Sequence, residues 1–297
     1  MTGRGSTWRW VTVIGVIVAL IVSVAACGDD DDEQSGQEGQ TQQTAPAGTS
    51  VARLQEEGEI TIGVKFDVPP FGFKNPQSGD VEGFDVEIGK AIADELGVEP
   101  QFVEAVSDNR IPFLQRGTVD LILSTMTINA ERDQEIDFSE PYYVARGRIL
   151  VPRGSDIRGV DDLAGKTVCT ALGSTYEETL REQAPQAERR LVDSYSECLE
   201  LMQTNAVDAI STDDVILTGM IIQDDSLELV GGEELTTEPY GAGIKEGDAA
   251  MQELVNGVIA DMKADGRWAA LYQEWIGQYT DERQEPPTMT LEEALAL

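Results

Sequence analysis

Short apolar segments and amphipathic segments alternate along most of this chain, and the alternation predicts its elements. The run at 60–64 is apolar and has the length of a strand. A loop with several turn residues follows, and then Ile88, Ile92 and Leu96 recur at helical spacing within 83–97. The globular part is therefore predicted to begin with a strand, a loop and a helix.

The same order recurs further along the chain. Additional strands are predicted at 101–106, 119–125, 161–172, 188–195, 207–212 and 241–245. Additional helices are predicted at 110–117, 174–183, 196–205, 213–222 and in one long segment that carries Leu254, Val258, Met262 and Trp268. Strands that alternate with helices form mostly parallel sheets covered by helices, so the pattern indicates an α/β fold.

The two halves of this series look alike. A turn and a buried strand follow a helix at 117–121, and the same succession stands at 205–209. We therefore expect lobe 1 to comprise 51–145 and 241–280, and lobe 2 to comprise 146–240. Residues 281–297 are expected to form a peripheral tail, with a packed last helix as the alternative. Because ligands of open α/β sheets bind beyond the carboxyl ends of the strands, two facing lobes would form a binding cleft.

Residues 1–26 have the features of an export signal. Arg4 and Arg9 precede a long apolar run, and the run ends in the sequence VAAC with Cys27 as its last residue. This ending resembles the bacterial lipobox, where a signal peptidase cuts before a cysteine that receives diacylglycerol. We expect Cys27 to carry a lipid anchor at the outer face of the cell membrane; a short transmembrane anchor is the alternative.

The stretch that follows Cys27 is acidic and has no aliphatic residue larger than alanine up to residue 50, which predicts a disordered tether at 27–50. The whole chain has 55 acidic and 21 basic residues, a formal net charge of −34. Removal of residues 1–26 would take away only Arg4 and Arg9 among charged residues, which changes this charge to −36. Such a protein repels nucleic acid and anionic surfaces, so nucleic-acid partners are excluded.

Histidine is absent, which excludes Ser/His/Asp and Cys/His catalysis as well as imidazole metal sites. Besides Cys27 the chain has Cys169 and Cys198, an even number in an exported protein. We expect these two to form a disulfide; two separate buried thiols are the alternative.

Five motifs carry a family resemblance, in the order VPPFGFKN, GFDVEIGKAIADELG, MTINAERDQEIDFSEPYY, LAGKTVCTALGSTYEE and AVDAISTDDVILTG. Together they resemble family 3 of the bacterial extracellular solute-binding proteins, over about residues 51–280, and are most similar to the glutamate-binding branch from actinobacteria. The resemblance implies a two-lobed periplasmic-binding-protein-like fold of type II with a two-strand hinge, and neither enzymatic activity nor a cofactor. It also implies a monomer that delivers a polar amino acid to the permease subunits of an ABC importer with a cytoplasmic ATPase.

An α-amino acid needs a cation for its carboxylate and an anion for its ammonium, because an unpaired buried charge is costly. The resemblance and this requirement indicate Arg132 as the carboxylate clamp, with contacts from Thr125 and Thr127. Ser174 opens a helix whose N-terminus can hold the same carboxylate, and Glu177 completes the pattern of a capping box. Asp213 matches the family's ammonium-binding aspartate; a helix N-cap is the alternative, and Asp214 is a weaker candidate.

Lys65, Ser107 and Arg110 are the expected determinants of the side chain that the site accepts. The stretch SDNRIPFLQRG resembles the corresponding stretch of acidic amino acid receptors, and Val68 and Ser107 stand where neutral amino acid receptors often have aromatic residues. Two additional cations favour glutamate or aspartate. Tyr195 is a further candidate for contact with the ligand.

Three other functions remain open at this point. A receptor for glutamine or asparagine would share the same head-group site. A sensor would dock to a transmembrane signalling protein instead of a transporter. A dehydratase on the same fold would need a proton-transfer group in the cleft.

Overall fold

The structure is a computed structural model, and it describes residues 45–232, 234–280 and 283–297. The expected signal peptide, Cys27 and most of the expected tether lie outside these residues. Residues 45–50, which we assigned to the tether, belong to the folded body: Thr49 caps helix α1 (Ser50–Glu57), and the Ser50 hydroxyl donates a hydrogen bond to Asp248 at 2.7 Å. None of the described helices has both the length and the apolar character needed to cross a membrane.

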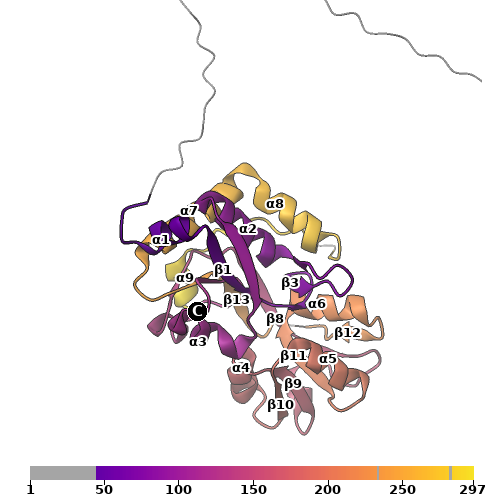
Figure 1. The fold of residues 1–297 in the computed structure, drawn as a ribbon. Helices are drawn as coiled ribbons and strands as arrows, with labels where there is room; N and C mark the ends of the chain where they lie inside the picture. The colour runs from indigo at the N-terminus through magenta and orange to yellow at the C-terminus, as the bar shows by residue number, and fades with distance from the viewer. Residues whose placement is uncertain (1–44, 233, 281–282) are drawn as a thin grey trace, which may run out of the picture. The chain divides into compact units, whose positions relative to one another are not determined.

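Lobe 1 contains a sheet with the strand order β5-β1-β6-β14-β7, whose strand β1 is labelled in Figure 1. Its strands are β1 (Glu59–Val64), β5 (Glu99–Glu104), β6 (Leu121–Ile122), β7 (Asp137–Phe138) and β14 (Gly243–Ile244). The helices of this lobe include α2 (Phe84–Leu96), α3 (Arg110–Arg116) and α7 (Ala249–Asp265), with a 3-10 turn (Ser107–Asn109) before α3. A small sheet of β2 (Asp67–Val68), β3 (Gly72–Lys74) and β4 (Val81–Glu82) precedes α2. The predicted helix at 83–97 is confirmed, and Gly97 ends it in the left-handed conformation.

Lobe 2 contains a second sheet with the order β10-β9-β11-β8-β12. Its strands are β8 (Tyr143–Pro152), β9 (Thr167–Ala171), β10 (Glu188–Val192), β11 (Ala209–Asp213) and β12 (Leu227–Leu229). The helices α4 (Thr175–Gln183), α5 (Tyr195–Gln203) and α6 (Asp214–Gln223) follow β9, β10 and β11 in turn, and a 3-10 turn (Val160–Leu163) precedes β9. Both sheets are mixed. The strands joined by helices pair in parallel, whereas β8 and β14, which enter from the other lobe, pair antiparallel.

The predicted likeness of the two halves extends to hydrogen bonds. In each sheet the first helix-linked strand lies between the second and the third: β1 between β5 and β6, and β9 between β10 and β11. The Asp120 carboxylate accepts from the Thr61 N–H at 2.9 Å, and the Asp208 carboxylate accepts from the Thr167 N–H at 2.8 Å. Each aspartate thus fixes the start of its third strand to the start of the first.

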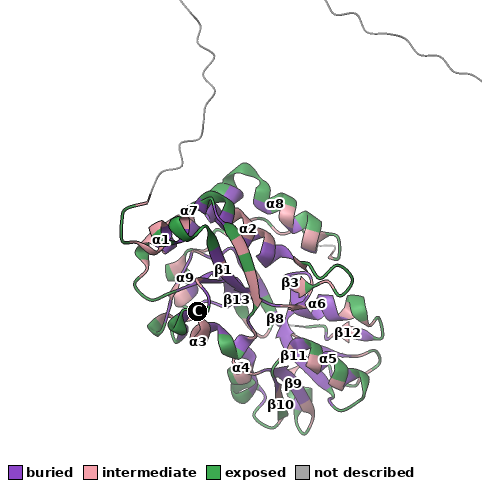
Figure 2. Cartoon of the chain, in the orientation of Figure 1, coloured by how far each residue is buried: buried purple, intermediate pink, exposed green. Residues whose placement is uncertain are grey.

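The lobes are connected by an antiparallel pair of strands. The first residues of β8 pair with β13 (Thr237–Tyr240), from Tyr143 opposite Tyr240 to Arg146 opposite Thr237. An isolated bridge between Thr127 and Tyr240 ties lobe 1 to this pair. The buried residues in Figure 2 follow the strands and the inner faces of the helices in both lobes.

The lobes also touch where two glycines permit close approach. A Cβ at Gly219, on α6, would lie 1.9 Å from the Pro69 carbonyl oxygen of lobe 1. A Cβ at Gly173, before α4, would lie 2.6 Å from the Cα of Asp108, and Gly173 also has a φ of +74°. The Asp67 carboxylate of lobe 1 accepts a hydrogen bond from the Ser196 N–H of lobe 2 at 3.0 Å. The structure therefore has the two lobes in direct contact.

The C-terminal region differs from the prediction in two respects. The expected single long helix is broken at Gly266, which has a φ of +89°, so that α8 (Arg267–Tyr272) and a π-helical turn (Gln273–Gly277) follow α7 separately. The end of the chain forms α9 (Leu291–Leu295), the alternative to a peripheral tail. Its Ala294 is buried, and a capping box between Thr290 and Glu293 fixes its start.

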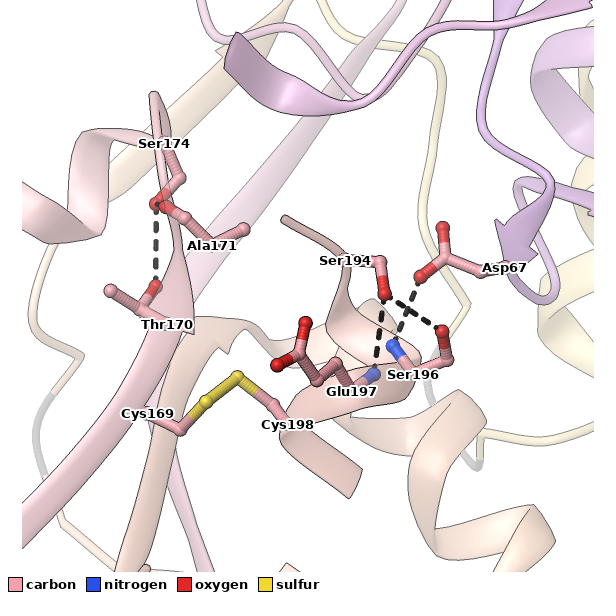
Figure 3. The surroundings of a disulfide bond; sticks show 9 residues. All are labelled: Asp67, Cys169, Thr170, Ala171, Ser174, Ser194, Ser196, Glu197 and Cys198. Carbon is pink, nitrogen blue, oxygen red and sulfur yellow. Dashed lines mark hydrogen bonds between the residues drawn. A yellow bond between two sulfur atoms is a disulfide. The ribbon is translucent and has the colours of Figure 1, made fainter. Parts of the chain in front are cut away.

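The predicted disulfide is confirmed: Cys169 on β9 and Cys198 on α5 are joined, with both residues buried (Figure 3). Figure 3 shows Thr170 and Ser174 beyond the cysteine on β9, and the start of α5 with Ser194 and Ser196 beyond the other. The bond therefore links the strand before α4 to the helix that begins at Tyr195.

Replacing both cysteines by alanine should lower the free energy of unfolding by about 3.5 kcal/mol, because the crosslink closes a loop of 29 residues in the unfolded chain. Urea unfolding measures this difference. Reductant should destabilise the unmodified chain and leave the double variant unchanged. Equal stability of the oxidised unmodified chain and the double variant would contradict the expectation.

Candidate functional site

A small, narrow cavity with a volume of about 10 Å³ lies where the two lobes meet. Both lobes line it, with Ser107, Arg110, Thr125, Thr127 and Arg132 from lobe 1 and Ser174, Thr175, Tyr176, Tyr195 and Asp213 from lobe 2. Eight of the nine residues that we expected to bind a ligand thus line one cavity. The ninth, Lys65, lies beside it, and its Nζ donates a hydrogen bond to Ser107 Oγ at 2.8 Å.

The strand order explains why residues far apart in sequence meet here. The relevant residues stand at or just after the carboxyl ends of the helix-linked strands: Lys65 after β1, Ser107 after β5, Thr125 after β6, Ser174 after β9, Tyr195 after β10 and Asp213 at the end of β11. Since the three strands of each set are parallel neighbours, their carboxyl ends lie at one edge of the sheet. The cavity is formed between these two edges.

Arg110 is held mainly by carbonyl groups of lobe 1. Its Nε donates to the Ser107 carbonyl at 3.1 Å, and Nη1 donates to the carbonyls of Ser124 and Thr125 at 3.0 and 3.1 Å. The Nη2 group donates across the cavity to the Gly173 carbonyl at 3.3 Å. Burial, together with the nearby Arg132 charge, lowers the pKa of Arg110 to about 9.

Arg132 retains more hydrogen-bonding capacity. Its Nη1 donates to the Thr127 carbonyl at 2.7 Å and its Nη2 to the Gly173 carbonyl at 3.1 Å. These two bonds to described residues leave three of the five guanidinium N–H donors for another partner. Burial lowers the pKa of Arg132, while the charge of Glu238 acts in the opposite direction. Both arginines thus converge on one carbonyl oxygen of lobe 2.

Lys65 is the third buried cation. Its pKa is lowered to about 7, first by burial and then by the charge of Arg110. The Nζ lies 5.6 Å from the centre of the Tyr195 ring, which lines the cavity. Burial raises the pKa of Tyr195 to about 12, so its hydroxyl stays protonated at neutral pH. Lys65, Ser107, Arg110 and Tyr195 therefore form one end of the site.

Asp213 occupies the N-cap position of α6, but its side chain makes no capping hydrogen bond. One carboxylate oxygen instead accepts from the Tyr176 hydroxyl at 2.9 Å. Its pKa is raised well above the ordinary value, mainly by burial and also by the charge of Glu238. The structure therefore does not support the N-cap alternative. Asp214 does not line the cavity and accepts from backbone N–H groups of Arg146 and Val215.

The expected capping box at Ser174 is wrong. Ser174 is the N-cap residue of α4 without a side-chain cap, and its hydroxyl donates to the Ala171 carbonyl at 2.7 Å. Glu177 lies instead 3.5 Å from the Gly173 N–H. The N-terminus of α4 consequently faces the cavity without a capping side chain of its own.

Two buried carboxylates near the cavity were missed by the sequence analysis. Asp85, on α2, accepts from the Thr125 N–H at 2.8 Å and from the Tyr142 hydroxyl at 2.8 Å. Thr125 has a φ of +44°, an uncommon value for a residue other than glycine, so Asp85 and Arg110 hold a strained residue in the lining of the cavity. Burial raises the pKa of Asp85 to about 7.

Glu238, on β13, is the second of these carboxylates. Its Oε2 accepts from the Thr127 hydroxyl at 2.6 Å and from the Thr175 hydroxyl at 3.0 Å. The sequence analysis quoted the motif that contains Asp85 but assigned no role to Asp85, and no motif or spacing indicated Glu238. The sequence analysis assigned three cations and one carboxylate, Asp213, to the site, and the structure adds these two carboxyl groups.

Residues 60–278 match the sequence model of the bacterial extracellular solute-binding proteins, family 3. The chain is 39% identical over 260 residues to the ABC transporter glutamine-binding protein GlnH of Bacillus subtilis, covering 86% of this chain and 93% of that protein. It is 30% identical over 292 residues to the glutamate-binding protein GluB of Corynebacterium glutamicum, covering 94% of each. Among solved structures, an ancestral arginine-binding protein bound to glutamine is similar with a TM-score of 0.71 and 35% identity, covering 74% of this chain and 98% of that one.

Replacing Asp213 with asparagine should stabilise the ligand-free protein at pH 8 by about 1 to 3 kcal/mol. The folded-state pKa of Asp213 is raised, so its ionised form destabilises the fold above that pKa. The difference should shrink as the pH falls through the raised pKa and vanish near the unfolded value of about 4. Urea unfolding of both proteins across this range is the measurement.

The matched control is Asp161→Asn, which removes an exposed carboxylate outside the cavity. It should not show the same gain at pH 8. An Asp213→Asn protein that is less stable than the unmodified chain at pH 8 would show that Asp213 is needed as a charged group in the empty site.

Proposed function

The chain belongs to family 3 of the bacterial extracellular solute-binding proteins, and we propose that its ligand is an acidic amino acid, glutamate first and aspartate second. At the level of the family it is an extracytoplasmic receptor that binds an amino acid for an ABC transporter. The observation that carries the choice of ligand is the convergence of Lys65, Arg110 and Arg132 on one small cavity.

We assign the α-carboxylate of the ligand to Arg132. Its three remaining N–H donors allow a bidentate contact, and the Gly173 carbonyl that now accepts from both arginines would be replaced by carboxylate oxygens. The N-terminus of α4, which lacks a capping side chain, supplies N–H groups and a positive dipole from the other lobe. Asp213 would take the ammonium, whose charge would lower the raised pKa of the carboxyl group.

The distal carboxylate is assigned to the end formed by Lys65, Ser107, Arg110 and Tyr195. The pKa values of Lys65 and Arg110 are both lowered, so the protein groups around them do not fully compensate either cation. Asp85 and Glu238 balance part of the total charge, but Asp85 is bonded to Thr125 and Tyr142, and Glu238 to Thr127 and Thr175. An anion between Lys65 and Arg110 would give both cations a charged partner in direct contact.

Glutamine is the second candidate ligand, and the relatives favour it. The glutamine-binding proteins of Bacillus subtilis and Geobacillus stearothermophilus are 39% and 36% identical to this chain, above the 30% of the Corynebacterium glutamate-binding protein. A pKa of about 7 for Lys65 also means that Lys65 is not permanently charged at neutral pH. We propose no enzymatic reaction, since these relatives are binding proteins.

We further propose that a lipid on Cys27 holds the receptor, as a monomer, at the outer face of the cell membrane, beside permease subunits served by a cytoplasmic ATPase. A sensor that docks to a signalling protein is the alternative partner arrangement. The VAAC sequence and the acidic stretch after it support the anchor.

Arg132→Ala should abolish measurable binding of glutamate and of glutamine alike, with a loss of about 2 to 5 kcal/mol in each case, because both ligands share the α-carboxylate.

Lys65→Met should weaken glutamate binding about tenfold or more and glutamine binding much less, because a neutral amide does not require a cation. Calorimetric titration near pH 6.5, below the pKa of Lys65, measures both ligands.

Lys65 gives a cleaner test than Arg110, since Arg110 also holds the carbonyls of Ser124 and Thr125 in place. Lys74→Met, which removes an exposed lysine outside the cavity, is the matched control. Equal losses for glutamate and glutamine in Lys65→Met would remove the assignment of this end to a carboxylate.

Mass spectrometry of the protein from its native host should find a mature N-terminus at Cys27 that carries acyl chains. This follows from the lipobox-like ending of the signal segment. A chain that retains residues 1–26 with unmodified Cys27 would instead support a transmembrane anchor.

A further inference from the structure

Glu238 is a buried carboxylate in the strand pair that joins the lobes. It lies on β13 opposite Ala145 of β8, and only 2% of the residue is exposed. It does not line the cavity, yet it is bonded to two residues that do, Thr127 from lobe 1 and Thr175 from lobe 2. Glu238 is therefore in contact with lining residues of the cavity from both lobes.

The direction of these two hydrogen bonds has a chemical consequence. A threonine hydroxyl has one proton to donate and two lone pairs that accept. Thr127 and Thr175 both donate their proton to Oε2 of Glu238, at 2.6 and 3.0 Å. Each hydroxyl oxygen can therefore offer only lone pairs to anything inside the cavity.

Asp213 lines the same cavity and is also an acceptor there. An ammonium group has three donors and no lone pair, and it fits acceptors from several sides. The hydroxyl group of a 2-hydroxy acid has one proton to donate, and its lone pairs would repel those of the threonine oxygens. The keto group of a 2-oxo acid has only lone pairs and no proton to donate. The arrangement discriminates among ligand head groups by the number of protons that they can donate.

We propose that Glu238 is a positioning residue that fixes the Thr127 and Thr175 hydroxyls as hydrogen-bond acceptors and so makes the site select α-amino acids over the corresponding hydroxy and keto acids. The proposal rests on the proposed amino acid ligand and adds the basis for head-group selectivity. The proposal also gives a role to the buried carboxylate of Glu238, since the nearby arginine side chains already donate to carbonyl groups.

The test compares the affinity for glutamate with the affinity for 2-hydroxyglutarate and with that for 2-oxoglutarate. Both ratios are measured by calorimetry in the unmodified chain and in Glu238→Gln. The glutamine amide can donate to the threonine oxygens and release their protons toward the cavity. Glutamate affinity should fall roughly tenfold or more, while the affinities for the two analogues stay the same or rise. Glu228→Gln, on another strand that pairs with β8 but outside the cavity, should leave all ratios unchanged.

A double-mutant cycle separates positioning from a general effect of charge. In a Thr127→Val, Thr175→Val background Glu238→Gln should change the ratio far less than in the unmodified chain, because the groups through which it acts are gone. If Glu238→Gln does not fold, the double valine variant alone must show the reduced ratio. Equal losses for glutamate and both analogues, or an unreduced ratio, would overturn the proposal.

The proposed function is tested separately by the unmodified chain. If it binds glutamine more tightly than glutamate, the same ratios are taken with glutamine and 2-hydroxyglutaramate, and the inference about Glu238 stands or falls on them. If the unmodified chain binds no α-amino acid at all, the proposed function fails and the inference about Glu238 falls with it.

Discussion

Three cationic side chains are buried at the contact between the lobes, and within the described residues none of them has a carboxylate at ion-pair distance. Lys65, Arg110 and Arg132 are all less than a tenth exposed, and each donates only to hydroxyl or carbonyl oxygens. Buried charges are costly without a partner, and carbonyl dipoles supply only part of the compensation. The three cations thus lack a carboxylate in direct contact, and a ligand that brings carboxylates would stabilise the lobes in contact.

The rest of the fold brings these three cations together at the contact between the lobes. Each lobe has the same order of three parallel strands, with an aspartate fixing the third strand to the first. The strand ends of both lobes therefore present their side chains at matching edges. The strand pair β8 and β13 joins the lobes, while Gly173 and Gly219 allow them to approach. The disulfide stabilises the strand and helix that present Ser174 and Tyr195.

Much of this could be read from the sequence, because apolar periodicity and glycine positions are local signals. They gave the helices at 83–97 and 174–183, and motif resemblance gave the nine expected site residues. Contacts between residues far apart in the sequence could not be predicted from it. Glu238 is bonded to threonines 111 and 63 residues away, and Asp85 supports Thr125 from 40 residues away. The break at Gly266 was missed although the spacing changes there: Trp268 follows Met262 by six residues, which does not keep it on the same helix face. The capping box is absent because the Glu177 carboxylate lies at the N–H of Gly173 and not at that of Ser174.

The central claim is that the end of the cavity formed by Lys65 and Arg110 accepts a carboxylate. Calorimetric titration of the unmodified soluble body at pH 8, in buffers with different ionisation enthalpies, tests it most directly because Lys65 is mostly neutral there. Glutamate should bind more tightly than glutamine and should take up more protons, since a carboxylate beside Lys65 raises its pKa. Tighter binding of glutamine, with the same number of protons exchanged for both ligands, would contradict the account.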